Sequence, residues 1–179
     1  IVQVEGYAQA EPVNPVLKQF TELTAMTEEL ETLWQSLPLE GKSPQKRAEL
    51  LNQAAADSLH YVPGVTGIIT TAGQALTLGS GVCQDYAHIL LALARRSGFA
   101  ARYCMGLVPG EGATHAWVEI ALPDGWHGYD PTFACEAGED HLRFAVGRDA
   151  ADCRAERGVF RGMADQTLHT EMRLNVRNG

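Results

Sequence analysis

The chain has 179 residues and a formal net charge of −8, with 45% of its residues hydrophobic and 20% charged. This length and composition predict one globular domain with a substantial apolar core. No stretch concentrates Lys and Arg as a nucleic acid or an anionic membrane surface requires, so neither is expected as a partner. No apolar run approaches the roughly 20 residues of a membrane-spanning helix.

The cysteine content predicts free thiols. The four cysteines are Cys83, Cys104, Cys135 and Cys153. None belongs to a CxxC pair of the kind that binds structural zinc. A domain of this length does not require disulfides, so we interpret the thiols as reduced and predict a cytoplasmic location.

The histidines do not predict a metal site either. Four of them lack a carboxylate at matching spacing: His60, His127, His141 and His169. We therefore expect no metal and no cofactor.

The N-terminal part begins with a short predicted strand at residues 1–4, and residues 1–14 are interpreted as a strand and linker that precede the main domain at 15–179. Apolar residues at helical spacing follow, with a break at Thr27, which can cap a second helix. They are Val16, Phe20, Leu23, Leu30, Trp34 and Leu37. A further helix is predicted from Ser43-Pro44 to the residues before Pro63, because serine is a common cap and proline suits the first helical position.

The middle of the chain predicts a short helix at 70–78, a tight loop at 79–81 and a long helix at 83–97. The long helix is almost wholly apolar, which is typical of a helix buried on all sides. Arg95 and Arg96 favour its C-terminal end, and Gly98 suits the residue after that end. His88 lies on this helix, and we interpret it as a hydrogen-bonded core residue.

The second half changes to strands, predicted at 101–108, 115–122, 126–130, 141–146 and 171–176. Residues 123–125, Pro-Asp-Gly, are a hairpin signal between two of them. Helices followed by antiparallel strands predict an α+β domain in which helices pack on a sheet.

Cys83 begins the long helix and follows Gly-Ser-Gly-Val. Backbone N–H groups at a helix start stabilise negative charge, and the thiolate is the reactive form of cysteine. This position therefore suits a nucleophile, and the N–H of Cys83 can donate to an oxyanion. A buried cysteine at a helix end is the alternative.

His115 and Asp130 supply the other groups that a cysteine nucleophile needs. An imidazole can take the thiol proton and return it to the leaving group, and a carboxylate can fix the tautomer of that imidazole. Pro131 holds Asp130 in an extended conformation. A hairpin closed around Asp124-Gly125 places Asp130 opposite Glu119, four residues away from His115. Contact between Asp130 and His115 then requires a β-bulge, a strong twist of the strands, or a position of His115 just before the first paired residue of its strand.

Three sequence blocks together resemble the bacterial transglutaminase-like family. They are GVCQDYAHILLALARRSGFAARY, THAWVEIALPDGWHGYDPT and VGRDAADCRAERGVFRG, and the similarity covers roughly residues 60–162. The resemblance implies a papain-like α+β core whose central helix bears the nucleophile and packs against an antiparallel sheet. It also implies a triad of Cys83, His115 and Asp130 that acts on amides through a thioester.

The chain departs from the family pattern in two places. Residues 152–155 read Asp-Cys-Arg-Ala, where the family often has Asp-Val-x-Pro. Many members carry a β-rich domain before the core, of which residues 1–14 would be a remnant, while 15–179 form the transglutaminase-like catalytic domain.

Several other residues have predicted supporting roles. Tyr61 and Gln84 are expected near the oxyanion, although packing is the alternative for Tyr61, and Trp117 is expected to pack or to line the cleft. Asp85 suits the first helical turn, but its charge would oppose a nearby thiolate unless it is turned away. A salt-bridged loop is expected from Arg148, Asp149, Asp152, Arg157 and Arg161.

The sequence as a whole predicts a cysteine-dependent amide or peptide hydrolase, or an acyl transferase, acting on a peptide, protein or small amide. Water is the expected acceptor, because no lysine-binding subsite is recognisable. A catalytically inactive binding or scaffold module is the alternative, and a zinc protein is a weaker one. No sequence feature specifies an oligomeric state.

Overall fold

The structure is a computed structural model that describes residues 13–110 and 114–154. The predicted strands at 1–4 and 171–176, most of the predicted N-terminal linker, and His169, Arg157 and Arg161 lie outside the described residues. The helical elements are η1 (Pro15–Lys18), η2 (Glu22–Thr24), α1 (Glu28–Gln35), α2 (Pro44–Asp57), α3 (Ala72–Leu78) and α4 (Cys83–Arg96).

The strands form two sheets. A small parallel pair joins β1 (His60–Tyr61) to β2 (Ser80–Gly81). The main sheet contains β3 (Ala101–Leu107), β4 (His115–Leu122), β5 (Gly125–Asp130), β6 (Cys135–Ala137) and β7 (Leu142–Gly147). Its order is β6-β5-β4-β3-β7, and every pairing is antiparallel. The predicted α+β class with an antiparallel sheet is therefore confirmed.

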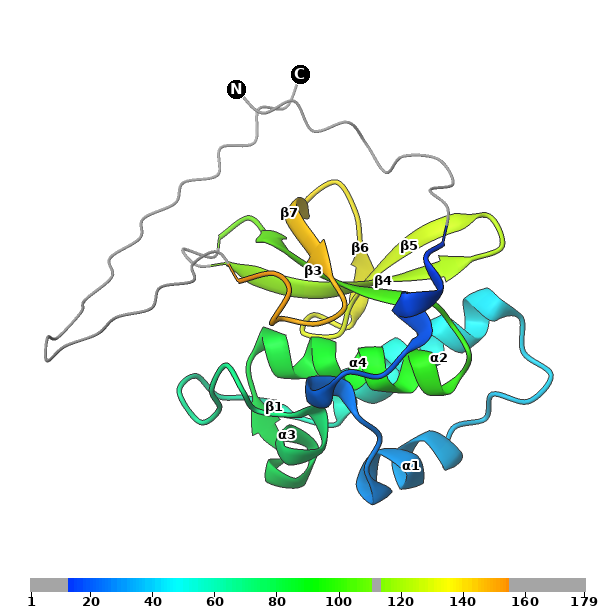
Figure 1. The fold of residues 1–179 in the computed structure, drawn as a ribbon, viewed down its shortest axis with the longest axis horizontal. Coiled ribbons are helices and arrows are strands. Elements are labelled where there is room, and N and C mark those ends of the chain that lie inside the picture. The colour runs from blue at the N-terminus through cyan, green and yellow to red at the C-terminus, as the bar shows by residue number, and fades with distance from the viewer. Residues whose placement is uncertain (1–12, 111–113, 155–179) are drawn as a thin grey trace, which may run out of the picture.

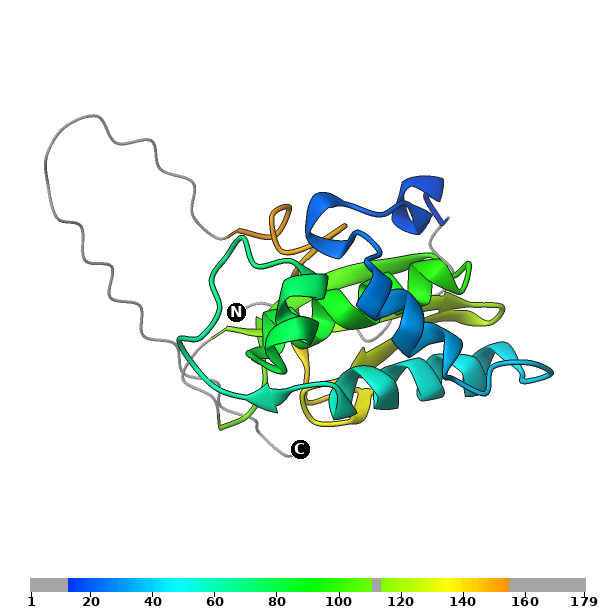
Figure 2. The ribbon, with the colours of Figure 1, turned by 90° about the horizontal axis from the view of Figure 1, so that it is seen from below.

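Helix α4 is the centre of the fold. It packs against the main sheet, while α1 and α3 lie on its far side (Figures 1 and 2). Its residues from Asp85 to Arg95 are all buried, and Ile89, Leu90 and Leu93 share the core with Val118 and Ile120 of β4. A helix enclosed on all sides must be apolar on all sides, as the sequence predicted. None of the described helices has the length and apolar run needed to cross a bilayer.

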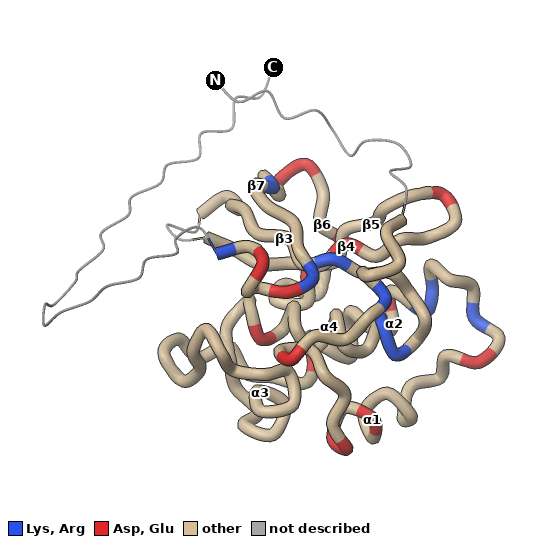
Figure 3. Tube along the Cα trace, in the orientation of Figure 1, with Lys and Arg blue, Asp and Glu red and all other residues tan. Residues whose placement is uncertain are grey.

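Local sequence sets the helix starts that we predicted. The side chains of Thr27, Ser43 and Thr71 accept hydrogen bonds from backbone N–H groups in the first turns of α1, α2 and α3, so each supplies a cap. The first turn of α1 is acidic (Figure 3), which favours the positive end of the helix dipole.

The predicted helix at the start of the domain is wrong. The segment from Val16 to Leu23 forms the short turns η1 and η2, with extended backbone at Gln19 and Thr21. The side chains of Asn14 and Thr21 bond locally, Asn14 to the N–H of Val16 and Thr21 to the hydroxyl of Thr24. Such local bonds compete with a continuous helix. Three short strands, β1, β2 and β6, were also not predicted.

The hairpin between β4 and β5 corrects the predicted register. Leu122 pairs with Gly125, so the loop is Pro123–Asp124, and Val118 pairs with Tyr129. Continuing this register by one residue places Asp130 level with Trp117 rather than with Glu119. Asp130 is then a diagonal neighbour of His115 on the same face of the sheet, within reach of a long side chain.

Candidate active site

Cys83 is half-buried at the first position of α4. The preceding residue, Val82, is extended, and its N–H donates to the Asp85 carboxylate (2.8 Å). The Thr66 hydroxyl donates to the same carboxylate oxygen at 2.6 Å. Burial raises the pKa of Asp85, and this effect outweighs the two hydrogen bonds, which lower that pKa. Asp85 thus caps the helix that carries Cys83, whose N–H lies in the first turn, where an α-helix provides no partner for it.

His115 and Asp130 meet at one end of the main sheet. His115 Nε2 lies 2.6 Å from Asp130 Oδ2, and neither side chain is exposed. The other Asp130 oxygen, Oδ1, accepts the N–H groups of Thr132 (2.8 Å) and Phe133 (3.4 Å). Burial alone would raise the pKa of Asp130, but its hydrogen bonds outweigh burial and lower that pKa.

The Cys83 thiol also acts on the protonation of the His115 ring. Burial lowers the pKa of His115, but its interactions with Asp130 and Cys83 outweigh burial, so the net shift is upward. Nε2 is engaged by Asp130, and Nδ1, the other ring nitrogen, is buried. The structure therefore brings His115 and Asp130 into hydrogen-bond contact, and Cys83 acts on the pKa of His115. A triad made of all three residues stays a prediction.

A second histidine, His141, belongs to this site and was not predicted there. Its Nε2 lies 3.0 Å from the same oxygen, Asp130 Oδ2. The expectation that His141 has no carboxylate partner is wrong, because the fold brings together groups that are 11 positions apart. His115, Asp130 and His141 each offer an atom within 4.8 Å of the others, a spacing that a metal ion could use.

Aromatic rings surround His115. Phe133 stacks on it at a centroid distance of 5.1 Å and is half-exposed, whereas Trp117 lies at 6.3 Å and is fully buried. Trp117 therefore packs behind the imidazole, the first of its two expected roles, and does not present a wall to the cleft. Phe133 has the exposed surface for that role, and its place three residues after Asp130 is the signal that sequence reasoning missed.

The two predicted oxyanion residues have other contacts. Tyr61 is half-exposed and stacks on Tyr86 at a centroid distance of 6.5 Å. The side-chain amide of Gln84 donates to the carbonyl of Gly67 (3.3 Å). These contacts favour packing of Tyr61 and anchoring of the preceding loop by Gln84, and an oxyanion role for either stays a prediction.

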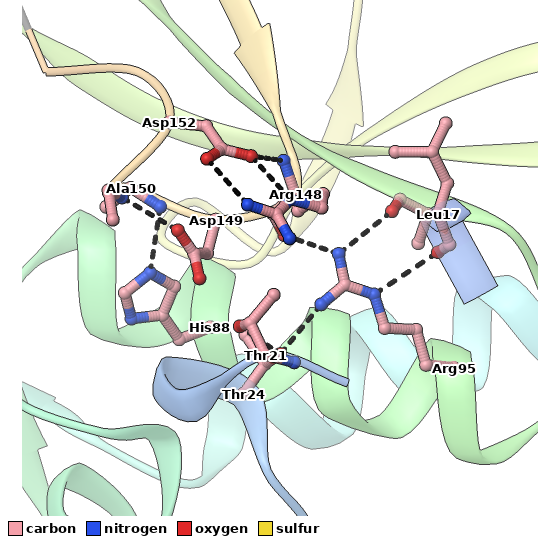
Figure 4. Close-up of polar contacts among 11 residues, drawn as sticks. Leu17, Thr21, Thr24, His88, Arg95, Arg148, Asp149, Ala150 and Asp152 are labelled. Carbon is pink, nitrogen blue, oxygen red and sulfur yellow. Dashed lines mark hydrogen bonds and ion pairs between the residues drawn. The ribbon is translucent and has the colours of Figure 1, made fainter. Parts of the chain in front are cut away.

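A second polar cluster joins α4 to η2 and to the turn after β7 (Figure 4). His88 is fully buried and accepts the N–H of Ala150 (3.3 Å), which confirms it as a hydrogen-bonded core residue. Arg148 and Asp152 form an ion pair (2.8 Å). The predicted salt-bridged loop is thus confirmed for its described part.

The fold is an α+β fold of the cysteine-protease-like kind. A sequence profile described as the transglutaminase-like superfamily matches residues 32–131, more than half of the chain. The chain therefore belongs to the transglutaminase-like superfamily.

Solved structures agree with this assignment. A candidate cysteine protease from Cytophaga hutchinsonii aligns with a TM-score of 0.68 at 23% identity, over 76% of this chain and 47% of that one. The periplasmic domain of TgpA from Pseudomonas aeruginosa aligns with a TM-score of 0.52 at 25% identity, over 69% of this chain and 49% of that one. Calcium-bound LapG from Legionella pneumophila has a TM-score of 0.51 at 16% identity, over 66% of this chain and 71% of that one.

Relatives by sequence include uncharacterized mycobacterial proteins. One from Mycobacterium leprae is 36% identical over 129 residues, which is 66% of this chain and 46% of the relative. One from Mycobacterium tuberculosis is 34% identical over 116 residues, which is 56% of this chain and 37% of the relative. The matched part of this chain thus spans less than half the length of these curated relatives.

Proposed function

We propose that this protein is a cysteine-dependent amide or peptide hydrolase in which Cys83 is the nucleophile, His115 the acid-base and Asp130 the group that orients His115. The observation that carries the proposal is the buried hydrogen bond between His115 and Asp130. Cys83, at the N-terminus of α4, supports it because its thiol helps to raise the pKa of His115. This arrangement supports a thiolate beside an imidazolium, the ground state of many cysteine enzymes.

The proposed first half-reaction makes a thioester. The Cys83 thiolate attacks the amide carbon, and the carbonyl oxygen becomes an oxyanion facing the N–H groups of the first turn of α4. As the C–N bond breaks, His115 gives its Nδ1 proton to the nitrogen, which leaves as an amine or ammonia. The acyl group remains on sulfur.

The proposed second half-reaction releases the acyl group. His115 Nδ1, now neutral, takes a proton from water, and the resulting hydroxide attacks the thioester as the C–S bond breaks. The products are a carboxylic acid and the regenerated thiolate–imidazolium pair. An amine in place of water would give transamidation, which is the acyl-transfer variant of the same chemistry. Neither route needs a cofactor.

The alternative proposal is a binding or scaffold module with an inactive triad. The buried His115–Asp130 bond does not favour it, because an isolated binding surface has no use for a buried imidazole-carboxylate pair facing a thiol. A cytoplasmic location stays a prediction, supported by four free cysteines, while the TgpA domain to which the chain is similar is periplasmic.

The first experiment measures the rate of Cys83 alkylation by iodoacetamide between pH 4 and 9, with the site mapped by mass spectrometry. We expect rapid alkylation well below the pKa of a free thiol, about 8.5. In His115→Ala we expect the rate at pH 6 to fall by roughly two orders of magnitude, since the thiolate then loses its imidazolium. A short cysteine peptide alkylated in parallel supplies the reference for a free thiol.

The outcome against the proposal is a free-thiol profile at Cys83 that His115→Ala leaves unchanged. If the profile supports the pair, a glutamine-containing peptide panel with and without excess primary amine then separates hydrolysis from transamidation. Hydrolysis predicts deamidated or cleaved peptide in both samples and no amine adduct.

A further inference from the structure

We propose that His141 is a positioning residue of this site, an imidazole whose Nε2–H donates to Asp130 and stabilises its ionised form beside His115. The inference rests on the proposed function, since it assigns a role relative to the triad. No part of the sequence motif that defines the triad includes His141.

The topology explains how His141 reaches Asp130. Strands β6 and β7 are consecutive along the chain but lie at opposite edges of the sheet. Residues 138–141 connect these two edges, and the bond of His141 to Asp130 places the connection at the end of the sheet where β5 finishes and β4 starts. His141 ends this connection, and the edge of its ring meets Trp117 at a centroid distance of 5.2 Å.

The hydrogen bonds of His141 define its tautomer. The N–H of Gly138 donates to His141 Nδ1 at 3.3 Å. A backbone N–H can only donate, so Nδ1 must present its lone pair, and the ring proton is left on Nε2. That proton points at Asp130 Oδ2, 3.0 Å away. His141 is thus a hydrogen-bond donor whose orientation is fixed by the backbone.

The consequence falls on Asp130. Its Oδ2 accepts from two imidazoles and its Oδ1 from two backbone N–H groups, so all the bonds that keep a buried carboxylate ionised are made. Within the part of the chain that the structure describes, Cys135 on β6 is the titratable strand partner of Asp130. The pKa of that thiol is raised by partial burial first and by the charge of Asp130 second.

A metal ion held by His115, Asp130 and His141 is the competing interpretation. A ligating nitrogen must offer its lone pair to the ion. The Gly138 bond leaves the lone pair of His141 on Nδ1, facing away from Asp130. The geometry therefore favours Asp130 as a hydrogen-bond acceptor shared by His115 and His141, rather than as a ligand in a metal centre.

The test compares His141→Met with His141→Gln. Glutamine can place an amide N–H where Nε2 lies, whereas methionine has similar length and volume without a donor. We expect the acid limb of the Cys83 alkylation profile in His141→Met to move up by about one pH unit, a roughly tenfold rate loss at pH 5, because Asp130 then takes up its proton more readily. His141→Gln should stay within about twofold of the parent protein.

Two outcomes would overturn the inference. A His141→Met profile that matches the parent protein means that the Nε2–H has no influence on the triad. Equal shifts in both variants mean that the ring is needed only for packing. Stoichiometric zinc in the purified parent protein, lost in both variants, would instead establish the metal interpretation.

A second measurement is independent of triad reactivity. In protein labelled with [15N]histidine, long-range 1H–15N spectra report which ring nitrogen carries the proton, and the His141→Gln spectrum assigns the signals. We expect His141 to be protonated on Nε2 alone at pH 7. A proton on Nδ1 would overturn the inference even if His141→Met does not fold, whereas failure of the proposed function would appear only in the His115→Ala comparison.

Discussion

At the scale of a single residue, Asp130 makes the largest number of hydrogen bonds described in this site. It is fully buried, yet its pKa is lowered because burial is outweighed by hydrogen bonds from His115, His141 and the backbone. The same carboxylate therefore closes the turn after β5 and orients the imidazole. These two tasks use different oxygens, Oδ1 for the turn and Oδ2 for the histidines.

The separate use of the two oxygens predicts the behaviour of Asp130→Asn. The amide oxygen can keep the bond to the Thr132 N–H, while the amide NH2 then faces two imidazole N–H donors. We expect Cys83 alkylation at pH 6, and any amide hydrolysis, to fall by roughly 10²- to 10⁴-fold. The far-ultraviolet circular dichroism spectrum should be unchanged, so a loss of helical signal would show that the variant disrupts the fold rather than the chemistry.

At the scale of elements, α4 joins the site to the rest of the domain. Its first residue is Cys83, and near its last turn the buried Arg95 donates to four groups of other segments. These are the Leu17 carbonyl (3.2 Å), the Thr24 hydroxyl (2.7 Å), the Ala101 carbonyl (3.2 Å) and the Arg148 carbonyl, as Figure 4 shows for those it labels. Arg95 thereby fastens η1, η2, β3 and the turn after β7 to the central helix.

The planar fork of Arg95 should not be replaceable by another cation. We expect Arg95→Lys and Arg95→Met each to lower the free energy of unfolding by about 2–4 kcal/mol in urea titrations, because several buried carbonyls lose their donors. The pH profile of Cys83 alkylation should keep its shape, since Arg95 lies about 18 Å along the helix from Cys83. Full stability in Arg95→Lys would show that charge alone, rather than the fork, fastens these segments.

At the scale of the whole molecule, the buried side chains of His88 and His115 affect the free energy of unfolding in opposite directions as the pH changes. Burial lowers the pKa of His88 to about 4, so the unfolded chain binds its proton first as the pH falls below about 6.5. His115 has a raised pKa through Asp130 and Cys83, which outweigh burial. Its contribution to stability is complete below about pH 6.5 and is lost as the pH rises through its folded value.

We therefore expect the free energy of unfolding to fall by roughly 3 kcal/mol through His88 between pH 6.5 and 4. His88→Gln keeps an acceptor for the Ala150 N–H but cannot be protonated in this range, so it should remove most of this acid slope. Urea titrations at pH 4.5, 5.5 and 6.5 measure the slope. His127→Gln is the matched control, because His127 is partly exposed on the β4–β5 hairpin, and an equal flattening in that variant would contradict the assignment to His88.

The sequence by itself determined the central apolar helix with Cys83 at its start, the strands that begin with His115 and end with Asp130, and the α+β class. These features depend on short-range periodicity, caps and turn residues, which act within a few positions. It failed at residues 16–23, where local side-chain bonds of Asn14 and Thr21 replaced a continuous helix with two short turns.

Only the tertiary structure decided which polar groups meet. The two-residue loop Pro123–Asp124 set the register that brings Asp130 diagonal to His115, and the crossing from β6 to β7 delivered His141 to the same carboxylate. The burial that placed Trp117 behind the imidazole, and left Phe133 exposed in front of it, likewise follows from sheet packing. Contacts of this kind depend on register and on chain crossings, and no spacing within the linear sequence encodes either one.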